Sequence, residues 1–536
     1  MSFSFSLIDE AWIPCVAADG HAMQYLGIRD TLLRAHELRE MCDPSPLVTV
    51  CLHRLLLAVL YRALAPVKTQ EQWVELWEAK RFLADRIESY LTQWRDRFDL
   101  FSAEHPFYQT AGLTADRPDT VTRLATELAS GHNPTLFDHH SDDALPSRTP
   151  ADAARRLVAA QAYALGFGKS GRVQIGAVEV APPYSTDAIL TRGVTVWLAG
   201  DNLFETLLLN LVPVRGHTRD RPAWELEPGE PEKLMDGTGT DGRKVHAAQG
   251  VLDRFTWQSR RVLLLPEDEA GATIVRRLYF SQGRSGDRSP DDPMKAYKRE
   301  EAEGFVPVRL SGHKAAWRDL HTLLVWQEAA KRPAALNHVA ELVRQGVLDA
   351  RRLYSVNVVG LATAPNKPGK FVLWRHDRVP IRAALAEDQN LAGEVENATR
   401  IAEEMAGHLR DRVRRVCRLF LAPDSDRPQG RSASPEDATR LLDALDPRRT
   451  YWARLEPRFY ELLRDLPDDP DGASDRWMDA VEAQARTSLQ EACRALGISA
   501  RALRAVAKVP GSFRVPGRLD STRPAEPPQE APTGRR

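Results

Sequence analysis

The sequence predicts an α+β protein, in which a mixed α/β N-terminal domain (residues 1–378) precedes an all-α four-helix bundle (residues 379–510) and a disordered tail (residues 511–536). In the first part, alternating β-branched segments and apolar helical segments follow one another, which is typical of a mixed domain. In the second part, apolar residues recur at three- and four-residue steps, as in amphipathic helices. Past Pro510 the chain is rich in Pro, Arg and Glu without periodicity, which predicts disorder.

Composition limits the classes of function. With 536 residues, 43% of them hydrophobic, the chain can bury the cores of two or more domains. It has no run of eighteen apolar residues and no signal-like start, so we expect a cytoplasmic protein without a membrane span. Its five cysteines form no Cys-x-x-Cys pair, which predicts reduced thiols and no zinc. The formal net charge of −1 means that nucleic-acid contacts must come from local basic patches.

The N-terminal segment predicts short strands and then helices. Residues 4–16 indicate a strand, a turn and a second strand, and Asp19-Gly20 has the composition of a hairpin turn. A helix is expected around residues 26–38, and Pro46 opens a strongly apolar helix. His36 and His53 lie on these two helices, and we expect each to be a packed, hydrogen-bonded histidine; a role as a metal ligand is the less favoured alternative.

The rest of the N-terminal domain alternates between helical and extended patterns, with an aromatic turn near residues 98–109 and a polar surface loop over 215–250. Helices are predicted near residues 73–94, 150–164, 203–211, 317–327 and 337–347, and strands near 194–198, 251–265, 276–280, 353–360 and 371–377.

The bundle is expected to contain four helices. An apolar stripe runs from Leu391 to Phe420, and Ser434-Pro435 has the composition of an N-terminal cap of a second helix reaching about Leu463. Further helices are expected at about 474–496 and 499–506, which completes the bundle.

A glycine-rich loop directly follows the helix predicted at 150–164. Gly166, Gly168 and Gly171 let a backbone lie against a ligand surface, while Lys169 and Arg172 supply donors for phosphate. This chemistry suits a nucleic-acid backbone. An ordinary glycine-rich surface turn explains the same residues.

A second unusual loop, residues 130–143, precedes that helix. It contains a cluster of possible metal or acid–base groups: Asp138, His139, His140, Asp142 and Asp143. Such groups could serve a metal-dependent nuclease or hydrolase. Adjacent ligands on a loop, without helical spacing, make this the less favoured alternative.

Several blocks in the same order resemble one known family. They are Phe5-x-Leu7-Ile8-Asp9-Glu10-x-Trp12-Ile13-Pro14, Leu26-x-Ile28-Arg29-Asp30-x-Leu32-x-x-Ala35-His36, Leu52-x-Arg54-Leu55-Leu56-Leu57-Ala58 and Thr191-Arg192-Gly193-Val194-Thr195 with Asn202-Leu203-x-x-Thr206-Leu207-Leu208-Leu209-Asn210. Together they are similar to CasA, the large subunit of the type I-E CRISPR surveillance complex Cascade.

The resemblance implies a non-catalytic subunit without metal or cofactor. It implies recognition of the protospacer-adjacent motif in double-stranded DNA, help in strand opening and R-loop stabilisation, and recruitment of a helicase-nuclease. The implied partners are the other Cascade subunits, the 5′ handle of the CRISPR RNA, the target duplex and the helicase-nuclease.

The resemblance also implies site residues, each with a plain structural alternative. Phe137 would stack on a base, or anchor its loop. Gln282 or Arg284 stands nearest to where the family has a minor-groove lysine. A wedge for strand opening, or an ordinary hairpin, maps to Asn366, Lys367, Pro368 and Gly369. The ridge that would follow the displaced strand, or simply face solvent, is Arg410, Arg414 and Arg418.

Overall fold

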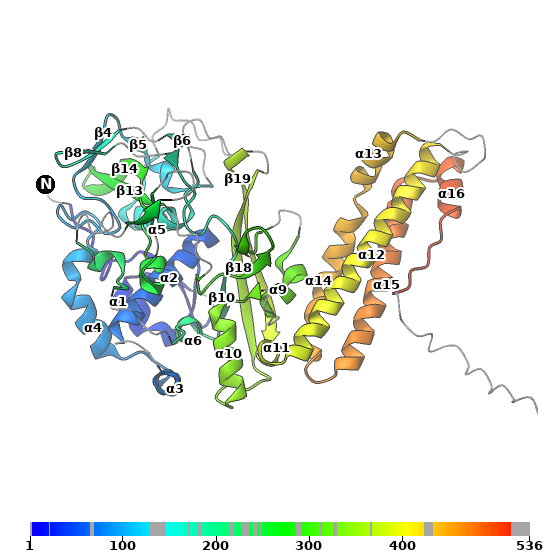
Figure 1. Ribbon diagram of the computed structural model, residues 1–536, viewed down its shortest axis with the longest axis horizontal. Helices are drawn as coiled ribbons and strands as arrows, with labels where there is room; N and C mark the ends of the chain where they lie inside the picture. Colours follow the sequence, from blue (N-terminus) through cyan, green and yellow to red (C-terminus); the bar gives the residue numbers. More distant parts are fainter. Residues whose placement is uncertain are drawn as a thin grey trace, which may run out of the picture. The chain divides into compact units, whose positions relative to one another are not determined.

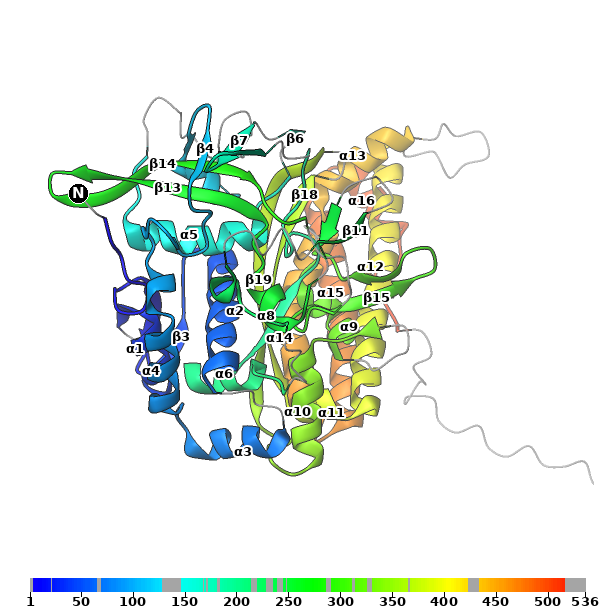
Figure 2. The ribbon, with the colours of Figure 1, turned by 60° about the vertical axis from the view of Figure 1, so that its left-hand side comes forward.

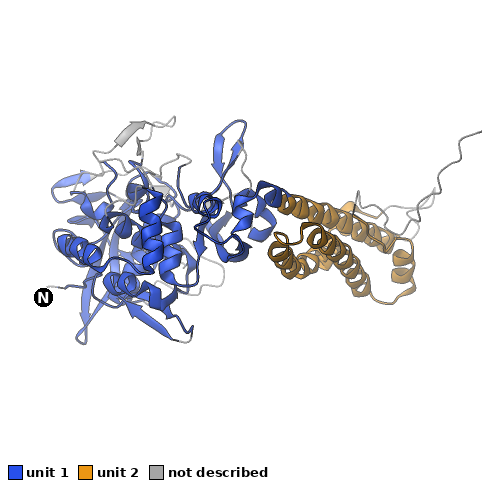
Figure 3. Cartoon of the chain, turned by 90° about the horizontal axis from the view of Figure 1, so that it is seen from below, with its two compact units in different colours: residues 1–393 blue, residues 394–536 orange. Residues whose placement is uncertain are grey.

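The structure, a computed structural model, divides the chain into two compact units, residues 1–393 and 394–536 (Figure 3). It describes residues 3–20, 22–64, 69–127, 146–166, 168–169, 172–180, 184–213, 219–227, 235–238, 244–246, 248–285, 291–310, 314–324, 330–364, 367–422 and 433–515. The predicted mixed α/β part followed by a helical part is confirmed.

Helix α2 (Pro46–Ala63) forms the centre of the first unit, and every one of its residues except Arg62 is buried. It packs against α4 (Ala84–Gln93), α5 (Pro150–Tyr163) and α6 (Leu203–Asn210), with α5 lying across one end of α2 in Figure 2. By length and composition α2 could pass for a membrane span, as core helices also do, but 94% of it is buried inside the unit. A helix that is apolar on all sides belongs in a core.

The N-terminal strands differ in part from the prediction. The hairpin of β1 (Ile13–Ala17) and β2 (Met23–Leu26) is confirmed, with Gly20 at φ 75° in its turn. No strand forms at residues 4–8, where the structure has one isolated bridge and a turn. The reason is tertiary: the carbonyl of Leu7 accepts the Trp12 indole N–H at 2.8 Å, so this turn is packed into the core.

Two further segments differ from the sequence-based expectation. Residues 251–255, expected to be extended, form helix α8, whose N-terminal amides donate to the Asp220 carboxylate. The expected surface loop 215–250 is not exposed throughout, since Trp224 is 5% exposed and packs on Phe98 with ring centroids 5.1 Å apart. One buried tryptophan therefore ties part of this polar segment to the core.

The sheet nearest to the second unit in the sequence consists of β10 (Thr195–Ala199), β18 (Leu353–Ala364) and β19 (Lys367–Arg382), all antiparallel. Figure 1 shows β18 and β19 as a long hairpin. Because β19 continues to Arg382, the predicted domain boundary at 378 falls inside a strand.

The first unit also contains further helices and strands. They are α1 (Ile28–Leu33), β3 (Leu38–Met41), α3 (Gln70–Ala79), β4 (Leu113–Ala115), β5 (Asp119–Thr120), β6 (Gly168–Lys169), β7 (Val173–Ile175), β8 (Val178–Val180), β9 (Tyr184–Ser185), β11 (Met235–Thr238), β12 (Lys244–His246), α8 (Val251–Phe255), β13 (Arg260–Glu269), β14 (Ala272–Gln282), β15 (Tyr297–Glu300), β16 (Gly304–Pro307), α9 (His321–Leu324), β17 (Ala330–Lys331), α10 (Ala334–Arg344) and α11 (Ala384–Glu387).

The helical unit is built from α12 (Gln389–Leu421), α13 (Pro435–Leu445), α14 (Pro447–Asp465), α15 (Pro470–Ala495) and α16 (Ala500–Ala507). The single helix expected from Pro435 to Leu463 is two helices, because Asp446 adopts φ 32° before the proline that opens α14. Trp477 donates its indole N–H to the Ala398 carbonyl at 3.0 Å, which fastens α15 to α12.

The start of the predicted disordered tail is ordered against the bundle. Phe513 is 2% exposed, and the Arg412 guanidinium lies 3.9 Å from its ring centroid. The backbone N–H of Val515 donates to Glu482 at 2.8 Å. Residues 511–515 therefore belong to the bundle, since Phe513 and Val515 bury apolar surface there; residues 516–536 lie outside the described part.

A histidine–tryptophan–histidine stack joins α2 to the sheet and predicts acid sensitivity. The ring centroid of Trp197 is 5.3 Å from those of both His53 and His376. Burial lowers the pKa of His53 to about 3 and that of His376 to about 4. Below about pH 6.5 the unfolded chain therefore binds protons that the folded chain does not. The free energy of unfolding is therefore undiminished by these histidines above that pH, and it decreases as the pH falls towards the pKa values of His53 and His376 in the folded chain.

We therefore expect His53→Leu to reduce the slope of unfolding free energy against pH by about 1.4 kcal/mol per pH unit between pH 4 and 6. Urea titrations of the full chain at several pH values measure this slope. An unchanged slope in the variant would contradict the assignment of a neutral, buried His53.

Candidate nucleic-acid interface

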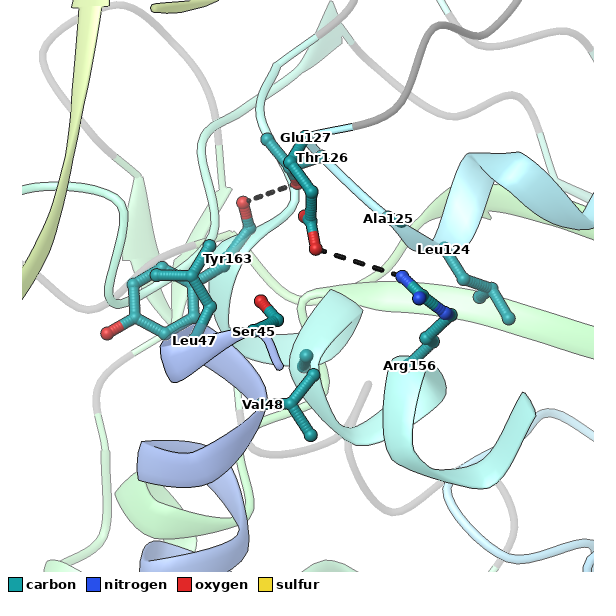
Figure 4. A pocket seen from close by; sticks show the side chains of 10 residues that line it. Ser45, Leu47, Val48, Leu124, Ala125, Thr126, Glu127, Arg156 and Tyr163 are labelled. Carbon is teal, nitrogen blue, oxygen red and sulfur yellow. Dashed lines mark hydrogen bonds and ion pairs between the residues drawn. The ribbon is translucent and has the colours of Figure 1, made fainter. Parts of the chain in front are cut away.

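Both loops singled out in the sequence are attached at the same end of α5. The Thr126 hydroxyl donates to the Tyr163 carbonyl at 3.0 Å, so the chain enters the 130–143 loop beside the last residue of α5 (Figure 4). The glycine loop begins three positions later, at Gly166. Phe137 and the Asp/His cluster lie outside the described residues. The structure thus brings together the starting points of two loops that lie on opposite sides of α5 in the sequence.

Ion pairs hold one end of the first loop, and backbone hydrogen bonds hold the other. Arg156 of α5 lies 3.7 Å from the Glu127 carboxylate and 3.1 Å from that of Asp152, as Figure 4 shows for Glu127. On the far side of the loop, the backbone of Arg148 exchanges two 2.9 Å hydrogen bonds with Val275 of β14. Helix α5 and strand β14 therefore hold the two ends of this loop.

The glycine loop departs from a tightly packed stem, whose two sides are residues 164–166 and 184–187. The Gly166 N–H donates to Asp187 at 3.0 Å, and a Cβ at Gly166 would meet the Ser185 carbonyl at 2.8 Å. Gly168 and Lys169 form β6, which pairs antiparallel with β9. The part predicted to be loop is therefore partly strand. Gly171 lies outside the described residues.

Arg172, the other predicted phosphate donor, remains at the surface. Its side chain is 80% exposed and lies 3.4 Å from Glu179, a pair that solvent screens strongly. An anionic ligand could therefore reach this guanidinium with little rearrangement.

Gln282 and Arg284 occupy the interior instead of a surface loop. Gln282 is 1% exposed, and its side-chain carbonyl accepts the Thr186 N–H at 2.9 Å. Arg284 is 5% exposed, pairs with the Asp253 carboxylate and lies 3.7 Å from the Trp257 ring centroid. Both side chains are buried, so neither can contact DNA directly in this structure.

The structure adds two residues that the sequence reasoning missed, Arg260 and Asp187. Arg260 is 1% exposed, and burial lowers its pKa to about 9, so it stays charged at neutral pH. A signal for it existed in the sequence: Arg260 has the same strand parity as the buried Val262 and Leu264. Asp187 had no such signal, because its role depends on the backbone of Gly166.

The tip of the β18–β19 hairpin is shifted from its predicted position. Ala364 pairs with Lys367, and Thr363 pairs with Phe371, so the β19 side carries three extra residues. Lys367, Pro368 and Gly369 therefore belong to an irregular strand end, not to the turn itself. Proline lacks an N–H for the ladder, which explains the bulge. Asn366 lies outside the described residues.

The arginine ridge lies along α12 of the second unit. Arg410 and Arg414 are half-buried, Arg418 is exposed, and their four-residue spacing places them on one side of the helix. Arg414 lies 3.4 Å from Asp411, which offsets part of its charge. The ridge is therefore a mildly basic surface.

In the part of the chain that the structure describes, no group of three or more His, Cys, Asp or Glu side chains is placed to hold a metal ion. The Asp/His loop proposed for metal-dependent hydrolysis lies outside that part.

Comparison with known proteins gives consistent matches over almost the whole chain. The family model described as CRISPR-associated protein Cse1 matches residues 6–497. The Thermus thermophilus protein CasA/Cse1 is 35% identical over 522 residues, covering 96% of this chain and 97% of the relative. The crystal structure of Cse1 from Acidimicrobium ferrooxidans superposes with a TM-score of 0.79 at 29% identity, covering 95% of this chain and 96% of that one.

A chain of a structure titled "CRISPR RNA-guided surveillance complex" has the same fold, with a TM-score of 0.74 at 22% identity, covering 94% of this chain and 98% of that one. The match of the family model and the identity to the Thermus thermophilus protein together show that this chain belongs to the family of CRISPR-associated protein Cse1, or CasA.

Proposed function

We propose that this chain is the non-catalytic large subunit of a type I-E CRISPR RNA-guided surveillance complex in the cytoplasm, where it recognises the protospacer-adjacent motif in double-stranded DNA. The observation that carries the proposal is the common departure point of the two loops at the C-terminal end of α5. A backbone-rich glycine loop with Lys169 and Arg172 suits a phosphate-lined groove. The neighbouring loop, with Phe137, would meet the 5′ handle of the CRISPR RNA by base stacking.

Strand opening would follow recognition. In this proposal the β18–β19 tip intrudes beneath the motif and offsets the cost of unstacking the first base step. The α12 ridge of Arg410, Arg414 and Arg418 would lie along the displaced strand. The first unit would then present the surface that recruits the helicase-nuclease.

Gly168→Asp tests the recognition step. A carboxylate at a glycine that approaches phosphates adds both bulk and repulsion, so we expect affinity for motif-containing duplex to fall at least about tenfold, ~1.4 kcal/mol. The measurement is duplex binding by the assembled RNA-guided complex, with the flanking bases varied.

The matched control is Gly393→Asp, since a side chain at Gly393 of α12 meets nothing within 4 Å and the position lies more than four helical turns before Arg410, the nearest residue of the ridge. It adds the same charge away from the loop and should leave affinity unchanged. Unaltered binding by a correctly folded Gly168→Asp complex would remove the glycine loop from the interface. Metal-dependent DNA cleavage by the isolated chain would contradict the non-catalytic assignment.

A further inference from the structure

The two sides of the glycine-loop stem are joined by one buried arginine. The Arg260 guanidinium donates to the carbonyls of Ala164 and Leu165, at 2.9 and 3.1 Å, just before the loop departs. The same nitrogen, Nη2, donates to the Thr186 carbonyl at 2.7 Å, just after β9 returns. A single planar group therefore fixes the separation of the outgoing and returning chains.

Gln282, at the end of β14, holds the returning chain at Thr186. Its side-chain carbonyl accepts both the Thr186 N–H at 2.9 Å and the Arg260 Nη1–H at 3.3 Å. Thr186 directly follows β9, and β9 holds Gly168 and Lys169 through the β6–β9 pairing. A rigid connection thus runs from the interior of β13 and β14 to the backbone of the glycine loop.

Asp187 completes the connection on the outgoing side. One carboxylate oxygen accepts the Gly166 N–H at 3.0 Å, and the other lies 3.3 Å from Arg192. The tight approach of Gly166 to Ser185 leaves no space for a side chain between the two sides of the stem. Three polar side chains, those of Arg260, Gln282 and Asp187, therefore hold the two sides of the stem at a fixed distance.

We infer that Arg260, Gln282 and Asp187 are positioning residues that set the angle at which the glycine loop meets DNA, and that they thereby determine discrimination of the flanking motif. The inference rests on the proposed function. It assigns Gln282 an indirect role in place of the direct groove contact that the sequence suggested. Misplacement of a recognition element by about 1 Å can cost a large part of its effect, because groove contacts are short-ranged.

Asp187 provides the sharpest test, because its side chain is 21% exposed, whereas Arg260 and Gln282 are each 1% exposed. Asp187→Ala removes the acceptor of the Gly166 N–H, whereas Asp187→Asn keeps an oxygen there. Arg192→Ala, the matched control, removes only the ion pair. The assembled RNA-guided complex is assayed for the ratio of affinities between motif-containing and motif-lacking duplex.

We expect Asp187→Ala to reduce that ratio about tenfold, and Asp187→Asn and Arg192→Ala to retain it. Gln282→Leu, which removes the acceptor for Thr186 and Arg260, should reduce the ratio as well. Asn210→Leu controls for the loss of a buried amide elsewhere. The Asn210 side chain accepts a hydrogen bond from the Leu198 N–H at 3.1 Å and donates one to the Leu198 carbonyl at 2.7 Å.

An affinity ratio for Asp187→Ala equal to that of the wild type would overturn the inference. A ratio that falls equally in Asp187→Ala and Asp187→Asn would overturn it too. These outcomes are distinct from failure of the proposed function, in which the wild-type complex itself would not discriminate the motif. Should Gln282→Leu not fold, the Asp187 pair decides alone.

Discussion

Replacing Arg54 by Met is expected to lower the free energy of unfolding of the first unit by about 3–5 kcal/mol, because it removes the hydrogen-bonded counter-charge of the buried Asp292 carboxylate. Arg54 is 1% exposed, and its guanidinium lies 3.0 Å from Asp292, 238 positions away in the sequence. Burial would raise the pKa of Asp292, but the charges of Arg54 and Lys295 outweigh it and hold the pKa at about 2.

Hydrogen exchange of the α2 amides in increasing urea gives the opening free energy of this unit separately from the bundle. The double variant Arg54→Met with Asp292→Leu should recover part of the loss, since replacing both buried charges removes the desolvation cost. Arg34→Met serves as control, because Arg34 is 42% exposed and its 3.0 Å contact with Glu37 should contribute less than about 1 kcal/mol. A loss that small in Arg54→Met would show that the buried pair does not stabilise the unit.

Replacing residues 366–369 by Asn-Gly is expected to slow strand opening about tenfold to a hundredfold while leaving motif binding nearly unchanged. The β19 side carries three extra residues at this tip, and the replacement removes two residues there, which shortens the part that would intrude beneath the motif. Unstacking a base step costs a few kcal/mol, and a wedge that offsets ~1.4–2.8 kcal/mol of it accounts for this range. R-loop formation by the assembled complex measures the rate.

A bubble target, already unpaired at the first bases, should restore the rate because the missing step has been done in advance. The control replaces residues 301–303, the exposed tip between β15 and β16, by Asn-Gly. Equal defects on duplex and bubble targets would mean that the β18–β19 tip is an ordinary hairpin.

Much of the fold could be predicted because local patterns were strong. The strongly apolar sequence of α2, the Asp19-Gly20 turn and the cap at Ser434 each specify their element through short-range chemistry. Several blocks in the same order as in the CasA family were also enough to suggest that family, which the comparisons confirm. Local patterns failed at residues 4–8 and 251–255, where packing by Trp12 and capping by Asp220 decided the backbone.

In the candidate site, too, some features were predictable from the sequence and others were not. The sequence by itself determined that a glycine loop with Lys169 and Arg172 follows a helix, because side-chain type and chain order are local properties. Only the tertiary structure decided that Gln282 is buried, that Thr126 meets Tyr163 and that Arg260 joins both sides of the loop stem. These depend on hydrogen bonds between residues 37 to 96 positions apart. No local pattern encodes such bonds, because a buried polar group is held by whichever backbone acceptors the fold brings to it.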